Sequence, residues 1–426
     1  MILTLAIHTV REAIRKKIPH ILISLGAIVL AISPFISTTH EPDALPKIML
    51  TVFFQAVALL CVTGIILFSA VSLPHDIENK TIFSILSKPV SQFKFVAGRT
   101  LGFALLAAFI LVALGLVNII SVFFASAHLP PEHRGIFKAR KEFGAHHFHI
   151  QGKIHHEKEG IRWVMGGREG IAIWHFSHLH EKAKNIPPFE VELRLKLDSS
   201  RNVADTIPLS IGIEGIQSKE NKTELVSAKA DETVTLGIPP EIIRKNNDIK
   251  ITVFPTLTAD YIGTAHNTIK VFSIQKGFVF NYAKALAITF LKFLLIIAIA
   301  VMGSAYLSAF VSILSAFAVF LCGHLLDFIK DFSLLLHHSG AHEHGLPGMI
   351  KKPSGFMIYM DYFFKKPLEW ISFILPDFKK FDILSYLLKG IDIPIETIGF
   401  SAGYTVLYVA ICTLISYILL KKREFF

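Results

Sequence analysis

Long apolar segments alternate with polar segments along this chain of 426 residues. A helix needs about 20 mostly apolar residues to cross the hydrocarbon layer of a membrane. Six segments meet that requirement: 18–36, 50–73, 101–124, 283–302, 306–328 and 400–420. The apolar region 278–328 is too long for one helix, and small and polar residues at 302–308 predict a turn within it. The pattern therefore predicts an α-helical polytopic membrane protein with six transmembrane helices, three in 18–127, two in 278–328 and one in 399–426.

The first 17 residues have an amphipathic helical pattern. Apolar residues recur at helical spacing, at Leu3, Ile7, Val10 and Ile14. Four basic residues fall largely off that stripe: Arg11, Arg15, Lys16 and Lys17. This pattern predicts a helix over 1–17 that lies in the membrane interface and leads into the first transmembrane helix. A cytoplasmic extension of that transmembrane helix is the alternative.

The segment 128–277 predicts a separate domain between the third and fourth transmembrane helices. Residues 128–185 are rich in His, Lys, Arg and Gly and have little clear period. Short alternating segments then follow at 189–197, 207–215, 232–238, 248–257 and 267–274, separated by turn-forming residues. Alternation with a period of two is typical of half-buried strands, so we expect a β-sandwich or jelly-roll-like domain.

A second polar segment, 329–398, contains apolar stretches that are too short or too interrupted to span a membrane. Its aromatic residues lie beside the pairs Lys365–Lys366 and Lys379–Lys380. Such neighbours suit helices at the membrane interface, where Trp370 and Tyr359 find both apolar and polar surroundings. A cap packed on the rest of the protein is equally compatible with the pattern.

Composition and charge agree with a membrane protein, because 52% of the residues are hydrophobic and only 18% are charged. A net charge of +10 also occurs in nucleic-acid-binding proteins, but here the basic residues are dispersed and many flank apolar segments. The N-terminal helix, the segment after the second transmembrane helix and the C-terminal tail are all richer in basic than in acidic residues. By the positive-inside rule, both termini and that segment are cytoplasmic, and 128–277 and 329–398 lie outside.

The cytoplasmic segment 74–96 carries its own helix-like pattern. One face of a short helix is marked by Ile77, Thr81, Ile82, Ile85 and Leu86. Lys88 and Pro89 end that helix, while Asp76 and Glu78 lie near its start, where carboxylates favour the positive end of the helix dipole. A helix held along the membrane would transmit a push from a soluble partner. A simple connecting loop is just as compatible with these residues.

The same segment resembles the signature of ABC-2 type permeases, the membrane subunits of ATP-binding-cassette transporters. The matching positions are Glu78, Thr81, Ile82, Leu86, Ser87, Lys88, Pro89, Gly98 and Arg99. The N-terminus is similar to the elbow helix of that family, with Thr9, Arg11, Glu12 and Arg15 at the matching places. The turn GSAYLSAFVS, the stretch LPDFKKFD and the tail KKREF are also similar, and the resemblance is closest to NosY-like subunits. The inserted domain at 128–277 has no counterpart in the basic family pattern.

The resemblance implies that 74–96 is a coupling helix that docks on a separate ATPase subunit through Asp76, Glu78, Thr81, Ile82, Ile85, Leu86, Lys88 and Pro89. It implies a dimeric membrane unit, made with a second copy or with a sister permease. No phosphate-binding G-x-x-x-x-G-K-[ST] motif occurs in the chain, so we expect ATP and Mg²⁺ on the partner and no cofactor on this chain. The expected function is transport without enzymatic activity of its own, with export favoured by the resemblance, and a periplasmic protein is a further possible partner.

Histidine clusters raise the alternative of metal binding. The candidates are His146, His147, His149, His155, His156, His175, His178 and His180. Imidazole is the commonest transition-metal ligand, but no Cys or Met joins these clusters and their spacing follows no recognised closed site. We therefore expect exposed surface histidines and assign no metal site. A copper- or zinc-handling maturation subunit stays as an alternative function, as does a membrane-anchored binding or assembly protein that works through its outer domain.

Two lysines and three cysteines fall in or beside the apolar segments. We expect Lys284 to extend to the outer interface, whereas Lys292 lies deeper in the fourth transmembrane helix. A charge within a membrane segment is a functional-site hypothesis by default, with a structural partner as the competing interpretation. The cysteines, Cys61, Cys322 and Cys412, have no metal-ligand spacing and are expected to be packing residues.

Overall fold

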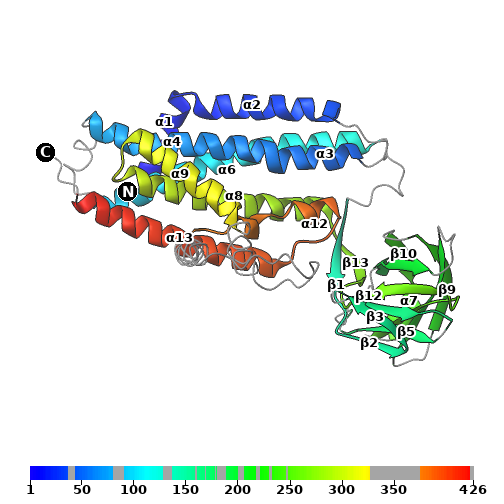
Figure 1. Ribbon diagram of the computed structural model, residues 1–426. Helices are drawn as coiled ribbons and strands as arrows, with labels where there is room; N and C mark the ends of the chain where they lie inside the picture. The colour runs from blue at the N-terminus through cyan, green and yellow to red at the C-terminus, as the bar shows by residue number, and fades with distance from the viewer. Residues whose placement is uncertain are drawn as a thin grey trace, which may run out of the picture. The chain divides into compact units, whose positions relative to one another are not determined.

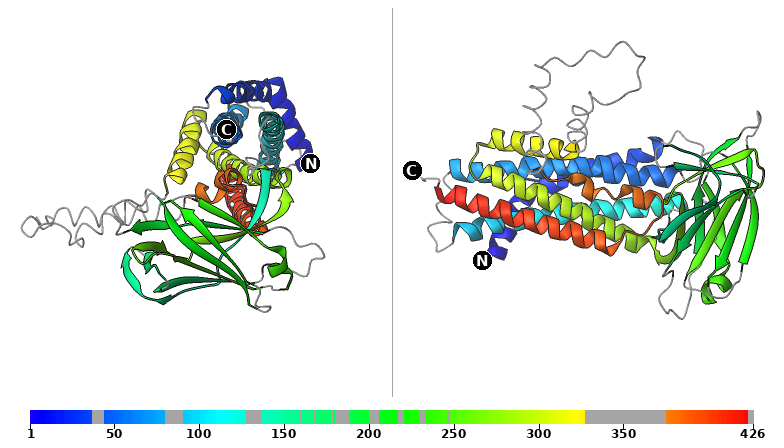
Figure 2. Two further views of the ribbon diagram at one scale, coloured as in Figure 1. Left: turned by 90° about the vertical axis from the view of Figure 1, so that its right-hand side faces the viewer. Right: turned by 60° about the horizontal axis from the view of Figure 1, so that its bottom comes forward.

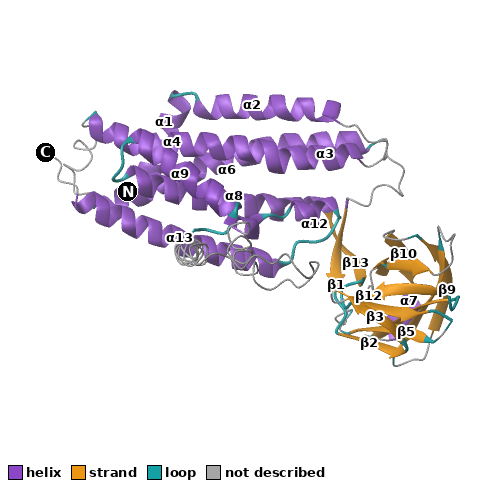
Figure 3. Cartoon of the chain, in the orientation of Figure 1, coloured by secondary structure: helices purple, strands orange, loops and turns teal. Residues whose placement is uncertain are grey.

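The computed structural model divides the chain into two compact units, here called the helical unit and the β-domain. The helical unit comprises Met1–Arg134, Tyr282–Leu388 and Ile393–Phe426, and the β-domain comprises Gly135–Asn281 with Lys389–Asp392. Figures 1 and 3 show the helices of the first and the strands of the second. The structure describes residues 1–36, 44–79, 91–127, 137–158, 161–167, 169–177, 179, 189–199, 206–216, 221–229, 233–245, 248–326 and 375–422.

The helical unit is built from long apolar helices that run side by side (Figures 1 and 2). In chain order they are α1 (Ile2–Arg15), α2 (Ile18–Ile32), η1 (Ser33–Ile36), α3 (Ala44–Val52), a π-helical turn η2 (Phe53–Val57), α4 (Ala58–Glu78), α6 (Gln92–Ser126), α8 (Phe278–Ser304), α9 (Ala309–His324), η5 (Phe378–Phe381), α12 (Leu384–Leu388) and α13 (Ile395–Lys422). The helix α1 and the C-terminal end of α13 lie at the same end of the unit.

Five of the helical stretches in the described residues are long and apolar enough to cross a membrane, which indicates a membrane-embedded protein. They are Ile18–Ile36, Ala44–Glu78, Gln92–Ser126, Phe278–Ser304 and Ile395–Lys422. The predicted turn at 302–308 is present between α8 and α9. Within the predicted span 306–328 the structure describes α9, which has 16 residues, while residues 327 and 328 lie outside the described residues, so the sixth crossing stays a prediction.

Glycines and small residues let α1 and α6 pack closely. A Cβ atom on Gly102 would lie 2.5 Å from the Thr9 Cβ, and one on Gly98 would lie 2.7 Å from the Leu5 Cβ. The buried residues of α1 are Ala6, Thr9 and Ala13, all small. Glycines four residues apart, facing small side chains, are a general way for helices to approach in membranes.

The expected apolar stripe of α1 lies on its exposed face. Leu3, Ile7 and Ile14 are 60%, 41% and 48% exposed, while Arg11 and Arg15 are also exposed. The helix prediction for 1–17 is therefore confirmed over Ile2–Arg15, and the stripe contacts none of the core. The small residues between the stripe and the basic residues make the contact with α6.

The β-domain contains antiparallel strands arranged in three sheets. The strands are β1 (Lys138–Phe143), β2 (His147–Gly152), β3 (Ile154–Lys158), β4 (Ile161–Met165), β5 (Gly170–Phe176), β6 (Phe189–Arg194), β7 (Lys196–Ser199), β8 (Ile207–Gly215), β9 (Asn221–Ala228), β10 (Thr233–Ile238), β11 (Ile249–Pro255), β12 (Asp260–Thr264) and β13 (Ile269–Gly277), with the short helix α7 (Pro240–Lys245). The sheet orders are β1-β13-β6-β10, β2-β5-β11-β8-β9 and β3-β4-β12-β7.

One hydrophobic core serves all three sheets. Strand residues alternate between this core and the surface, as in β11, where Ile249, Ile251 and Val253 are buried and pair with neighbours of the same kind. Trp174 is fully buried, and its Nε1 donates a hydrogen bond to the Ala265 carbonyl oxygen at 3.1 Å. Trp174 therefore belongs to the core, whereas Trp163 is only half-buried.

The His-rich region 128–185 is more ordered than its sequence indicates. Its described residues include β1 to β5, and these strands belong to all three sheets. In this region the lack of a clear alternation of apolar and polar residues therefore failed to indicate the strands that form. His, Lys and Arg occupy the outward positions, and His147 and His149 flank the half-buried Phe148 in β2.

A short return segment also belongs to the β-domain. Ile391 forms a parallel bridge with Arg140 of β1, and the Asp392 N–H donates to the Arg140 carbonyl oxygen at 2.7 Å. The Arg140 guanidinium donates to the carboxylates of Glu192 and Glu190 and to the Lys389 carbonyl oxygen. The segment predicted as one unit at 329–398 is thus divided, since 375–388 lies in the helical unit and 389–392 joins β1.

Candidate functional sites

Helices extend into both ends of the segment 74–96. α4 continues through Pro74 to Glu78, and α6 begins at Gln92 with Ser91 as its N-cap, whose Oγ accepts from the Lys94 N–H. Pro74 lies inside this helix, where its missing N–H removes one intrahelical hydrogen bond. The predicted docking residues Thr81, Ile82, Ile85, Leu86, Lys88 and Pro89 lie outside the described residues.

Arg99, in the second turn of α6, joins the two ends of that segment to α1. Its side chain is only 3% exposed. Its Nη1 donates to Glu12 Oε2 at 2.7 Å and to Thr9 Oγ1 at 3.5 Å, while Nη2 donates to Asp76 Oδ2. The three helices α1, α4 and α6 are therefore held by one buried cation between two carboxylates. We call this cluster the Arg99 node.

The Arg99 node changes the role expected for Asp76. The sequence placed Asp76 at the start of a docking helix, but its carboxylate is buried in the last turn of α4 and is engaged by Arg99. A buried carboxylate that is paired inside the protein is not available to a docking partner. Glu78, two residues later, is exposed and remains accessible.

Glu12 completes the electrostatics of the node. Burial by itself raises the pKa of this carboxyl, but hydrogen bonds from Lys16 and Arg99 outweigh burial and hold the pKa below its ordinary value of 4.5. Lys16 Nζ lies 2.8 Å from Glu12 Oε1. Of the predicted elbow residues, Thr9 and Glu12 thus contact Arg99, whereas Arg11 and Arg15 are exposed on the other side of α1.

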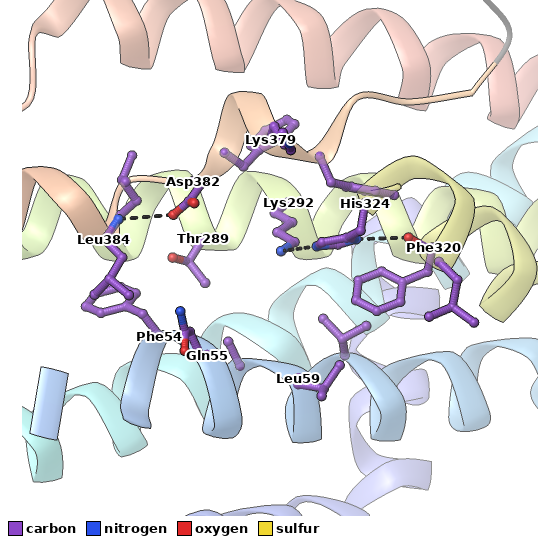
Figure 4. Close-up of a pocket in the computed structure, with 16 residues that line it drawn as sticks. Phe54, Gln55, Leu59, Thr289, Lys292, Phe320, His324, Lys379, Asp382 and Leu384 are labelled. Carbon is purple, nitrogen blue, oxygen red and sulfur yellow. Dashed lines mark hydrogen bonds between the residues drawn. The ribbon is translucent and has the colours of Figure 1, made fainter. Parts of the chain in front are cut away.

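A cavity of about 460 Å³ lies elsewhere in the helical unit, between η2, α4, α8, α9 and the η5–α12 region (Figure 4). Its walls are mainly apolar and aromatic, and its polar lining residues are Gln55, Thr289, Lys292, His324, Lys379 and Asp382. One wall is the π-helical turn that carries Phe54 and Gln55. Such turns occur frequently at functional sites.

Lys292 is the polar centre of the cavity. Its Nζ lies 3.0 Å from His324 Nε2, and His324 Nδ1 lies 2.9 Å from the Phe320 carbonyl oxygen. The His324 ring stacks on Phe378, with ring centroids 5.1 Å apart. The sequence singled out Lys292 but missed His324, Gln55 and Asp382, which come from segments that only the fold brings together.

Lys284, the other lysine of α8, is engaged differently from the expectation. It is 6% exposed, and its Nζ donates to the Ile393 carbonyl oxygen at 2.7 Å. A backbone acceptor inside the unit thus binds its ammonium, and its expected position near the outer interface stays a prediction. The three cysteines are free thiols, and Cys61 and Cys412 are buried, in agreement with a packing role.

The histidines of the β-domain gather in pairs. His147 pairs with His175 across β2 and β5, and the rings of His149 and His175 stack with centroids 5.4 Å apart. His155 stacks on Tyr261, and His156 stacks on Trp163. Among the described residues, no three His, Cys, Asp or Glu side chains converge to hold a metal ion. His178 and His180 lie outside the described residues.

His175 has a depressed pKa. Burial and the neighbouring His149, Lys250 and His147 all lower the pKa of its imidazole below 6.5. Protonation is disfavoured because a second positive charge would face Lys250, which pairs with His175 across β11 and β5. The sequence predicted exposed histidines, and the structure agrees for His146, His147 and His149, while His175 is half-buried.

No protein-family model matches the sequence, and no curated protein is similar enough to indicate a relationship. Among solved structures, the CBM22-1–GH10 modules of the Clostridium thermocellum endo-1,4-β-D-xylanase 10B, complexed with xylohexaose, are 11% identical over 32% of this chain, with a TM-score of 0.20. This chain covers 26% of that structure. TmCBM61 in complex with β-1,4-galactotriose is 11% identical over 33% of this chain and 88% of its own, with a TM-score of 0.13. Both TM-scores are too low to support an argument about fold or function.

Proposed function

We propose that this chain is the membrane-spanning permease subunit of an ATP-binding-cassette transporter of the ABC-2 type, driven by a separate ATPase subunit. The observation that carries the proposal is the Arg99 node. Asp76 lies in the last turn of the helix before the segment 80–90, Arg99 lies near the start of the helix after it, and Glu12 lies in the N-terminal helix. A force applied to that segment would therefore reach three helices together.

The chemistry of the node supports a mechanical role. Separating a buried guanidinium from its carboxylates costs several kcal/mol, on the order of 3–5, because each charge is left without a partner. The helices α1, α4 and α6 therefore move as one body when a partner pushes on the segment between α4 and α6. An ATPase subunit that closes on ATP would supply such a push, and the resemblance of this segment to the ABC-2 signature supports that choice of partner.

The membrane arrangement in this proposal has six crossings, with α9 and the residues after it as the fifth. Both termini are cytoplasmic in the inner membrane, α1 lies in the interface with Leu3, Ile7 and Ile14 in the lipid, and the β-domain is extracytoplasmic. The exposed apolar stripe of α1 supports this placement, because such side chains gain free energy from contact with acyl chains. Two permease chains form the working unit, and the direction of transport is export.

Co-purification from the native membrane tests the proposal. The full chain is isolated in mild detergent, and an accompanying ATPase is identified by mass and by Mg²⁺-dependent ATP hydrolysis. Thr81→Asp is expected to remove the ATPase, because it puts a charge on the proposed docking face. Thr223→Asp, the same change on the exposed strand β9, is the matched control and is expected to retain it.

An ATPase that is present with wild type and Thr223→Asp but lost with Thr81→Asp supports the permease function. If no ATPase accompanies the wild-type chain, the permease function fails. The β-domain would then be the working part of a membrane-anchored binding or assembly protein.

A further inference from the structure

Lys292 is placed where an ammonium group is costly. It lies near the middle of α8, about 20 Å along the helix from either end at 1.5 Å per residue. At that depth in a membrane-spanning helix a charge requires a partner, a polar cavity or a ligand. The surrounding rings of Phe320 and Phe378 have centroids 5.8 and 6.0 Å from Nζ, which stabilises the cation only modestly.

The neighbours of Lys292 do not neutralise its charge. Its hydrogen-bond partner among the described residues is His324 Nε2. Since His324 Nδ1 is directed to the Phe320 carbonyl oxygen and donates to it, Nε2 is the acceptor and the imidazole is neutral. No ion pair in the part of the chain that the structure describes involves Lys292. The lining carboxylate Asp382 acts on Lys292 electrostatically but forms no direct ion pair with it, and it accepts a hydrogen bond from the Leu384 N–H at 3.3 Å.

The cavity also has an apolar side. Phe54, Ala58, Leu59, Val62 and Leu321 line it together with the polar residues around Lys292. Figure 4 shows Leu59 and Phe54 on the η2–α4 wall, across the cavity from the Lys292–His324 pair. A ligand that fits both sides carries one charged end and one hydrocarbon end. The cavity volume of about 460 Å³ falls within the range of small-molecule sites in proteins.

We propose that this cavity binds an amphipathic anion, with its carboxylate or phosphate on Lys292 and its hydrocarbon tail against the η2–α4 wall. An anion supplies a counter-charge in direct contact with Lys292, whereas a neutral ligand leaves the ammonium without a direct ion pair and a cation is repelled by it. His324 positions the ammonium by accepting a hydrogen bond from one of its three N–H groups, which leaves the other two for the ligand. The same chemistry is offered by a phospholipid headgroup and by a single-tailed acid.

Photo-crosslinking of the purified full chain tests this site without an ATPase. The chain is placed in nanodiscs of phosphatidylcholine and exposed to a ten-carbon carboxylic acid that bears a diazirine in its tail. The matched diazirine alcohol is the neutral probe. Labelled peptides are identified by mass spectrometry, and we expect the acid, but not the alcohol, to label the lining residues of α4 and α9.

Four variants sharpen the test. Lys292→Met is expected to lower labelling by the acid about tenfold or more, the effect of losing one charged contact, whereas Lys292→Arg retains it. Ala58→Trp fills the cavity and is expected to abolish labelling. Ala56→Trp is its matched control, because Ala56 lies two residues before Ala58, is exposed and does not line the cavity.

Competition distinguishes the two sources of the anion. If phosphatidylglycerol in the nanodisc removes the labelling, the resident ligand is a lipid, and if octyl phosphate or decanoate alone removes it, the ligand is a single-tailed molecule. Equal labelling by acid and alcohol, no labelling of the lining residues, or unchanged labelling in Lys292→Met would each overturn the proposal. Because no ATPase is used, this result and the co-purification result are independent.

Discussion

Arg99 and Lys292 are both cations held inside the helical unit, but they have opposite surroundings. Arg99 donates to two carboxylates, from α1 and α4, and its side chain is almost completely covered. Lys292 borders a cavity, and its hydrogen-bond partner is a neutral imidazole. A cation that is paired with carboxylates of neighbouring helices holds those helices together. A cation that has no direct carboxylate contact among the described residues is positioned to bind an anion that enters the cavity.

The largest loss of stability that the comparison predicts comes from removing the paired cation, Arg99. In Arg99→Met, Asp76 and Glu12 stay close together without a cation between them, and the expected loss of unfolding free energy is about 3–5 kcal/mol. Thermal unfolding of the full chain in detergent measures it. Arg11→Met, on the exposed face of α1, is the control and is expected to change stability by less than about 1 kcal/mol. Equal losses of stability in the two variants would show that the Arg99 node does not hold the three helices together.

The second largest expected loss of stability comes from separating α1 from α6. Gly102→Leu places a side chain where even a Cβ atom would lie 2.5 Å from the Thr9 Cβ, so overpacking is expected to cost about 1–3 kcal/mol and to loosen α1. Hydrogen exchange of α1 amides is the measurement. Gly403→Leu in α13 is the matched control, because nothing lies within 4 Å of a Cβ built there. An α1 that stays protected in Gly102→Leu would mean that the Arg99 contacts alone hold it.

His175 is expected to make a smaller, pH-dependent contribution to the stability of the β-domain. Its pKa is below 6.5 in the folded chain, so the unfolded chain binds a proton more readily. Stability is therefore expected to fall as pH decreases below about 6.5, as the unfolded state takes up that proton. Hydrogen exchange of β5 in the full chain between pH 5 and 7.5 measures it. The His175→Gln variant is expected to lose this dependence, and a slope that survives the substitution would assign it to other groups.

Removal of the unpaired cation is expected to have the smallest effect on stability. Lys292→Met replaces an uncompensated ammonium with an apolar side chain of similar length, which is neutral or stabilising when no internal ion pair is lost. The same thermal unfolding assay measures it in parallel with Arg99→Met. A loss of several kcal/mol in Lys292→Met would show that the lysine is a structural element and would remove the contrast with Arg99.

The sequence predicted most of the helical unit, because its signal is simple. Twenty apolar residues in a row have few structural alternatives, and the turn after α8 was indicated by the small and polar residues at 302–308. The helix ends were less predictable. α4 extends past Pro74 and α6 begins at Gln92, because the pairing of Asp76 with Arg99 stabilises helical structure that the polar sequence does not suggest.

The β-domain and the cavity were harder to predict for different reasons. In the strands of 138–176 polar and apolar residues alternate only weakly, since β5 buries neighbouring as well as alternate residues, including Trp174 and Phe176, and β1 also pairs with a segment about 250 positions later. The cavity joins Gln55, Lys292, His324 and Asp382 from four separate parts of the chain. Lys292 alone carried a signal, a charge within an apolar segment, because no local pattern records which distant side chains approach it.

The central claim, that the helical unit is moved by a separate ATPase, is tested most directly by the accessibility of the cavity in native membrane vesicles. Gln55→Cys is introduced into a chain whose Cys61, Cys322 and Cys412 are replaced by Ala, and its maleimide labelling rate is measured with and without Mg²⁺-ATP. The account predicts that ATP changes the labelling rate and that Arg99→Lys weakens this response. A rate that is the same with and without ATP, in vesicles shown to contain the chain intact, would contradict it.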